Sequence, residues 1–251
     1  MTTGEAGQLL EARFETDIGQ VAIRRLLPQQ VGKVAARRTL DIMHDAYSAV
    51  QVANELITKE DVDDAFLVAE RTVNDSEDEE RVDLTVLSAD DVVRRQAERM
   101  RHYVHDNGST YWFASLIDGG LSAIEPIGLV KISPSNSRAR RLFHRQPNAY
   151  VHDVATRSAY MRHGIGSALL HTALSDFDAD REVVLDSQSD NREIDRWFHE
   201  IGLTGKATID PLVIGSSEIA QLRLGGATVD EVQGALEARY DWIAKAELVA
   251  A

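Results

Sequence analysis

The stretch that decides the fold is Tyr160-Met161-Arg162-His163-Gly164-Ile165-Gly166-Ser167-Ala168-Leu169-Leu170, where a polar turn with two glycines opens into an apolar run. The segment before it, residues 149–156, has the pattern of a strand. A strand, a glycine turn and a helix N-terminus together present free backbone N–H groups and the positive end of a helix dipole. This order of elements predicts a turn that binds phosphate.

The spacing of the glycines limits which phosphate ligand the turn suits. The pattern is G-x-G, and Leu169 stands where a dinucleotide fingerprint has its third glycine. The chain has no G-x-x-x-x-G-K-S/T, so a P-loop is excluded. Two alternatives stay open on this piece alone: a plain strand-to-helix turn, and a Rossmann-type site with Asp186 near the distance expected for its acidic residue.

A second motif follows about thirty residues downstream. Residues 183–187 form a short apolar run typical of a strand. Asn191 then predicts the start of a helix and Gly202 its end. Between them, one apolar face is expected to carry Ile194, Trp197, Phe198 and Ile201.

The two motifs together resemble those of the GNAT superfamily of acyl-CoA-dependent N-acyltransferases. In that family a strand leads into R/Q-x-x-G-x-G/A, and the next leads to N-x-x-A-x-x-x-Y-x-x-x-G-F. Asn191, Phe198, Gly202 and Leu203 fall at the spacing of the second motif. The close resemblance covers residues 149–203, and a looser one covers 21–224. It implies an α/β (α+β) fold with a mixed, mostly antiparallel central sheet flanked by helices.

The resemblance also implies a reaction. Acetyl-CoA, or a longer acyl-CoA, would be the cosubstrate, and a primary amine of a small molecule or protein would attack it directly in a ternary complex. The residues implied to bind the cosubstrate are Val154, Ala155, Thr156, Met161, Arg162, His163, Gly164, Ile165, Gly166, Ser167, Asn191 and Phe198. Candidate general bases are Asp153 and His152, which alternation places on opposite faces of the strand, with Asp153 preferred.

Two positions depart from the family pattern. Met161 stands where the family usually has Arg or Gln, so one side-chain contact to phosphate is lost. Phe198 stands at the usual tyrosine position and has no proton to donate. These departures keep a second hypothesis open: a catalytically weak or dead acyl-CoA-binding regulatory protein on the same fold.

The rest of the chain predicts three parts. Residues 1–18 are expected to be an N-terminal arm or short helix, 19–224 the acyltransferase domain with a helical insertion at about 58–87, and 225–251 a C-terminal helix opened by the capping box Thr228–Glu231. Expected strands cover 21–26, 111–117, 127–133, 206–209 and 218–224, with Gly225-Gly226 ending the last. Expected helices cover 30–56, 58–73 and 88–105.

Composition excludes several classes of function. With no cysteine among 251 residues, the chain has neither disulfides nor thiol nucleophiles, and the histidines show no ligand spacing, so no metal is expected. The net charge of −14 disfavours nucleic acid as a partner. No apolar run reaches the roughly 20 residues that cross a bilayer, and no signal peptide is evident, so we expect a cytoplasmic protein without a membrane partner.

Two charged segments bear on assembly. Residues 60–80 are strongly acidic, whereas Arg138, Arg140, Arg141 and Arg145 crowd the link between two expected strands. The basic link is either a solvated loop or a contact for an acidic partner. A contact with the acidic segment of a second copy would make the protein a homodimer.

Overall fold

The computed structural model describes residues 9–53, 89–118, 121–122, 125–135, 148–188, 192–214 and 217–250. The strands are β1 Leu9–Thr16, β2 Gly19–Arg25, β3 Thr110–Asp118, β4 Leu121–Ser122, β5 Gly128–Ser135, β6 Asn148–Thr156, β7 Glu182–Gln188, β8 Gly205–Ile214, β9 Ser217–Thr228 and β10 Glu247–Ala250. The helices are α1 Lys33–Ala53, α3 Ala89–Asp106, α5 Ile165–Leu174, α6 Arg192–Glu200 and α7 Val229–Arg239, with short 3-10 turns η1 Pro28–Gln30, η3 Ser158–Tyr160 and η4 Ile243–Lys245.

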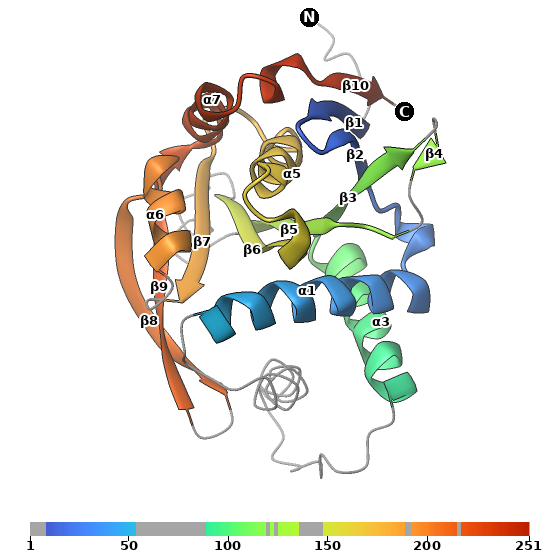
Figure 1. The fold of residues 1–251 in the computed structure, drawn as a ribbon. Coiled ribbons are helices and arrows are strands. Elements are labelled where there is room, and N and C mark those ends of the chain that lie inside the picture. The colour runs from blue at the N-terminus through green and yellow to red at the C-terminus, as the bar shows by residue number, and fades with distance from the viewer. Residues whose placement is uncertain are drawn as a thin grey trace, which may run out of the picture.

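All ten of these strands belong to one sheet, in the order β10-β1-β2-β3-β5-β6-β7-β9-β8, with β4 paired to β3 (Figure 1). Among the described strands, β6 and β7 make the one parallel pair, and every other pair is antiparallel. A dinucleotide-binding fold is built on a largely parallel sheet, so this topology excludes the Rossmann alternative. The predicted class, a mixed and mostly antiparallel sheet flanked by helices, is confirmed.

Helices cover both faces of the sheet (Figure 1). Val130 and Ile132 of β5 point to the face where α5 packs, and they share one apolar core with its Leu169. Leu129, one position away, points to the opposite face and packs with Ile42 of α1. The strand alternation of β5 therefore divides the interior into two layers, because successive side chains leave opposite faces of a strand.

Local sequence signals place several helix boundaries. Asp90 and Asp91 lie in the first turn of α3, where negative charge is favourable to the helix dipole. Helix α7 begins at the predicted capping box: the Thr228 hydroxyl accepts from the Glu231 backbone N–H, and Glu231 accepts from the Thr228 backbone N–H. Helix α7 contacts α5, so this C-terminal addition packs onto the core of the fold.

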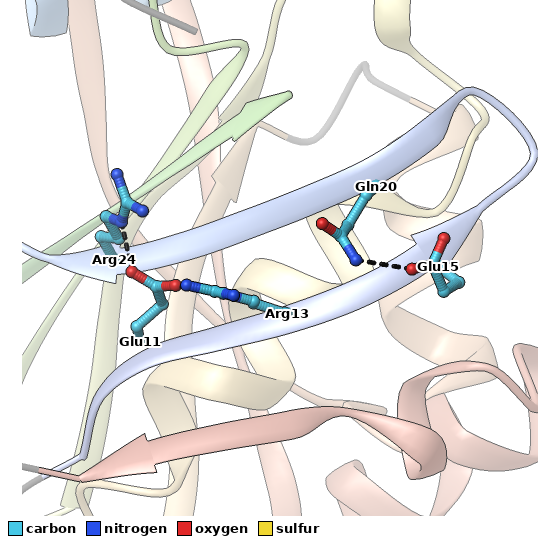
Figure 2. Close-up of polar contacts among 5 residues, drawn as sticks. All are labelled: Glu11, Arg13, Glu15, Gln20 and Arg24. Atoms are coloured by element: carbon cyan, nitrogen blue, oxygen red, sulfur yellow. Dashed lines mark hydrogen bonds and ion pairs between the residues drawn. The ribbon is translucent and has the colours of Figure 1, made fainter. Parts of the chain in front are cut away.

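The N-terminal segment differs from the predicted arm or short helix. Residues 9–16 form β1, which pairs with β2 on one side and with the C-terminal β10 on the other. Figure 2 shows Glu11 reaching Arg24 of β2 as well as Arg13 of its own strand, while Gln20 donates to Glu15 at 2.6 Å. Cross-strand polar pairs and buried Phe14 explain why a short amphipathic sequence becomes a strand here.

The end of β9 also differs from the prediction. Gly225 and Gly226 do not end the strand, which runs on to Thr228 and pairs Ala227 with Val183 of β7. Gly225 lies opposite Gly205 of β8, and a Cβ on Gly205 would stand 3.0 Å from the Gly225 carbonyl oxygen. The glycines allow the backbones of β8 and β9 to approach closely inside the sheet. The sequence alone does not distinguish such a glycine pair from one that forms a turn.

Several predictions fall outside the described residues. They are the helix at 58–73 with its insertion, the acidic stretch after residue 60, the basic link around Arg138–Arg145, and Asn191. Within the described ranges, no helix is both long and apolar enough to cross a membrane.

Candidate active site

The turn before α5 has the backbone shape of an anion site. Arg162 has φ 68°, which makes it the one non-glycine residue with positive φ in the described part of the chain, and Gly164 follows at φ 76° as the N-cap of α5. Such left-handed residues cost energy and gather at functional sites. Successive N–H groups in this conformation form a concave nest, and the dipole of α5 adds positive potential.

The C-terminal segment holds this turn in place. A Cβ on Gly164 would lie 2.7 Å from the ring of Trp242 and 3.1 Å from that of Tyr240. The Trp242 ring is itself fixed edge-on to Phe14 of β1, with centroids 5.6 Å apart. A Cβ on Gly166, in contrast, would make ordinary contacts at 3.6 Å with Val154 and Thr156 of β6. Gly164 is therefore required by both conformation and space, whereas Gly166 seats the helix against β6.

The side chains of the turn are already engaged. Arg162 donates to both carboxylate oxygens of Glu193 at 3.1 and 3.2 Å, and Nδ1 of His163 lies 2.7 Å from Oδ2 of Asp17. Met161 points inward and packs in the apolar cluster of Ile42, Ala46, Leu129 and Ala155. Ile165 and Ser167 are buried. Because these side chains already have partners, the backbone N–H groups are the candidates in this turn for binding an anion.

Strand β6 loses its neighbour just before this turn. Its parallel pairing with β7 ends at Val151, which lies opposite Leu185. Residues 152–156 keep β5 on one edge, and no described strand pairs with their other edge. The predicted cosubstrate residues Val154, Ala155 and Thr156 therefore lie on an open strand edge that leads into the phosphate turn. Such an edge offers backbone groups to an extended ligand.

A β-bulge interrupts β6 at the start of the open edge. Lys131 of β5 pairs with Asp153 while Ile132 pairs with Val151, so His152 is the extra residue. A bulge turns neighbouring side chains away from strict alternation. The prediction that His152 and Asp153 lie on opposite faces is therefore wrong. Asp153 is the register partner of Lys131, and His152 contacts Ser133, two residues after Lys131 and on the same face of β5, away from α5.

His152 sits in an aromatic cage. Its ring centroid lies 4.6 Å from that of Tyr150 and 6.1 Å from that of Tyr103, and its Nε2 is 2.7 Å from the Ser133 hydroxyl. Burial lowers the pKa of His152 to about 3, and the positive charge of Lys131 acts in the same direction. A neutral imidazole that holds a proton so weakly is a poor general base, so of the two candidates this environment favours Asp153.

The structure brings a lysine to this face that the sequence analysis did not single out. Lys131 is 4% exposed, and its Nζ lies 3.2 Å from the ring centroid of Tyr103 and 5.8 Å from that of Tyr111. Burial lowers the pKa of Lys131 to about 8, since desolvation of the ammonium outweighs the favourable charge of Asp153. One signal was available in the sequence: a single charged residue at an inward position of an otherwise apolar strand.

Asp186 is the centre of a polar network beside His152. Arg223 of β9 donates to the two oxygens of Asp186 at 2.7 and 3.0 Å, and the Tyr150 hydroxyl also donates to Asp186. Burial raises the pKa of Tyr150, and its hydrogen bond to Asp186 raises it further. Asp186 is therefore neutralised by Arg223 and serves to fix Tyr150 beside His152.

Of the second predicted motif, the structure describes Phe198, whereas Asn191 lies outside the described residues. Phe198 of α6 is 7% exposed in the same core as α5, and its ring lies 4.9 Å from that of Trp197. Its ring is part of that core and has no hydrogen-bond donor. Among the described residues, no group of three or more His, Asp or Glu side chains is arranged to hold a metal ion.

This chain is similar in sequence to a family of known proteins. Residues 73–203, just over half of the chain, match the family model described as the acetyltransferase (GNAT) family. The chain therefore belongs to the GNAT acetyltransferases. No curated protein matches it significantly.

Similar solved structures are distant in sequence. A GNAT-family putative acetyltransferase from Desulfovibrio desulfuricans is 16% identical, with 83% of this chain and 99% of that one covered and a TM-score of 0.42. A GNAT-family acetyltransferase from Streptococcus pneumoniae is 14% identical, with 82% and 98% covered and a TM-score of 0.43. NAA60 of Arabidopsis thaliana, solved with a bisubstrate analogue, is 17% identical, with 53% and 83% covered and a TM-score of 0.41.

Proposed function

We propose that this acetyltransferase moves an acetyl or other acyl group from acyl-CoA to a primary amine by direct attack in a ternary complex. The observation that carries the proposal is the open edge of β6 after Val151, which runs directly into the nest at Arg162–Gly164. The edge suits the amides of a pantetheine arm, and the nest suits a pyrophosphate.

The acceptor amine would approach on the face that carries Asp153. Holding the amine and the thioester together removes much of the entropic barrier to their reaction. Asp153 would take the ammonium proton directly or through water, leaving a neutral amine to attack the carbonyl carbon. As that C–N bond forms, a backbone N–H of the open edge near Val154 would stabilise the oxyanion. The C–S bond then breaks, and the second proton lost by the attacking nitrogen would pass through water to the departing CoA thiolate.

The second candidate is a catalytically weak acyl-CoA-binding protein on the same fold. Phe198 favours it, because this buried ring cannot protonate the departing thiolate, as a tyrosine at its position would. Water would have to supply that proton in an active enzyme.

One paired measurement separates the two candidates. Acetyl-CoA binding is followed by calorimetry, and CoA thiol release is followed with a panel of primary amines. Binding with amine-dependent thiol release supports the transferase, and binding with none supports the regulatory protein. Absence of binding would remove both.

A further inference from the structure

The charge of Lys131 is buried without an oxygen partner. In the described part of the chain its ammonium makes no hydrogen bond and no ion pair, and its close contacts are the faces of Tyr103 and Tyr111. The residue is 4% exposed. A buried charge is costly unless it is paired, and aromatic faces offset only part of that cost. This arrangement is the one expected when the missing anion belongs to a ligand.

A second cation lies against the same aromatic ring. Arg99 of α3 places its guanidinium carbon 5.7 Å from the centroid of Tyr103, and it forms no ion pair with any described residue. Its charge acts on Lys131, Tyr111 and His152 alike, which shows that these groups share one electrostatic environment. The Asp186 carboxylate cannot neutralise this pair of cations, because Arg223 already binds both of its oxygens.

The carboxylate of Asp153 lies on the same face of the sheet as Lys131, where it could bind a positively charged group at the other end of the ligand. Asp153 pairs with Lys131 across β5 and β6, at the start of the open edge. In the described residues its side chain makes neither a hydrogen bond nor an ion pair. Counting only partners within the described ranges, the face that carries Asp153 thus offers one carboxylate and two cations that form no ion pair.

We infer that the acceptor is a zwitterion of the amino-acid type, whose carboxylate binds between Lys131 and Arg99 while its amine lies at Asp153. The inference rests on the proposed function and names its substrate class. A purely cationic polyamine would leave both cations unpaired and add repulsion, so the site selects against it.

The test uses acceptors that differ only by a carboxylate: L-tyrosine with tyramine, L-ornithine with putrescine, and L-phenylalanine with phenethylamine. We expect kcat/KM for thiol release to favour the carboxylated member at least about tenfold in one or more pairs, as for loss of a buried charge pair. In Lys131→Met and Arg99→Gln the preference should fall about tenfold, because KM should rise more for the carboxylated member than for the decarboxylated one. Arg94→Gln, an exposed arginine of the same helix paired with Asp91, is the matched control.

A binding arm keeps this result separate from the proposed reaction. Each probe is also scored by thermal stabilisation of the intact protein, which needs no turnover. Carboxylated probes that stabilise the wild type but not Lys131→Met support the site even if no thiol is released. Equal stabilisation and equal kcat/KM within every pair would overturn it. Equal losses of kcat/KM for both members of a pair in Lys131→Met and Arg99→Gln would also overturn the proposal. That result would mean that the two cations act in proton transfer or folding and not in binding a carboxylate.

Discussion

At the residue scale, the candidate site depends on how burial changes each ionisable group. His152, Asp153 and Lys131 share one face of the sheet. Burial keeps His152 neutral, and the Lys131 ammonium forms no ion pair with any residue that the structure describes. The sequence alone favoured Asp153 over His152, but only by its place on the strand. The aromatic cage and the bulge separate them, because both arise from residues distant in the chain, such as Tyr103 and Ser133.

Replacement of Asp153 tests the base directly. Asp153→Asn preserves the size of the side chain but removes its ability to take a proton. We expect kcat to fall by about 10²–10⁴-fold, the usual contribution of a general base, while acetyl-CoA affinity stays unchanged. Asp230→Asn, in the exposed first turn of α7, is the control. Unchanged turnover in Asp153→Asn would remove this residue from the mechanism.

The buried histidine predicts a pH dependence of stability. The pKa of His152 is about 3 in the fold against 6.5 as its ordinary value, so the unfolded chain binds the proton first as pH falls. Stability should therefore decline below pH 6.5 by about 2 kcal/mol at pH 5 from this group alone. His152→Gln should lack that part of the decline when urea unfolding is compared at pH 7 and 5. An imidazole NMR signal assigned to His152 by its loss in His152→Gln, and titrating near pH 6.5, would contradict the prediction.

At the scale of elements, the phosphate turn is the part that sequence predicted best. A strand, two glycines and a helix gave β6, the turn and α5 almost to the residue, because turn glycines and helix starts are local signals. The residues that pack around the turn come from distant parts of the sequence. Trp242 reaches Gly164 from the C-terminal segment, and Asp45 of α1 accepts from the Ser158 hydroxyl at 3.1 Å.

The two glycines of the turn should respond differently to alanine. Gly164→Ala adds a left-handed alanine and a clash with Trp242, so we expect a loss of about 3 kcal/mol in unfolding free energy. Gly166→Ala has room for its methyl group and lies in a helix, so stability should change little or increase. Thermal unfolding of both variants checks this contrast, and equal losses would contradict the geometry described for Gly164.

At the scale of the molecule, the sheet joins both ends of the chain to the site. Strand β10 pairs with β1, and the segment between α7 and β10 carries the aromatic rings that support the turn. The sequence suggested separate terminal additions to a central domain. The structure instead places residues 9–16 and 247–250 in the same sheet as β6.

Hydrogen exchange should reveal which part of the sheet receives the cosubstrate. If acyl-CoA pairs with the open edge, amides within residues 152–156 and 162–167 should gain protection when acetyl-CoA is added. The β1–β10 pair, whose strand partners are already present, should not change. Protection confined to other segments would show that the cosubstrate does not lie along β6.

The sequence by itself determined the strand–turn–helix at residues 149–170, because glycine positions and hydrophobic period act over short distances. Its two motifs also identified the family, and the mostly antiparallel fold followed from that resemblance. Only the tertiary structure decided which charges have no ion-pair partner among the described residues and where β6 has no described strand beside it. Those features depend on packing among α3, β3, β5 and β6, which brings Arg99, Lys131 and Asp153 together from three parts of the chain. The burial of Lys131, which no local sequence pattern encodes, is the basis for the proposal that its ammonium binds the acceptor's carboxylate.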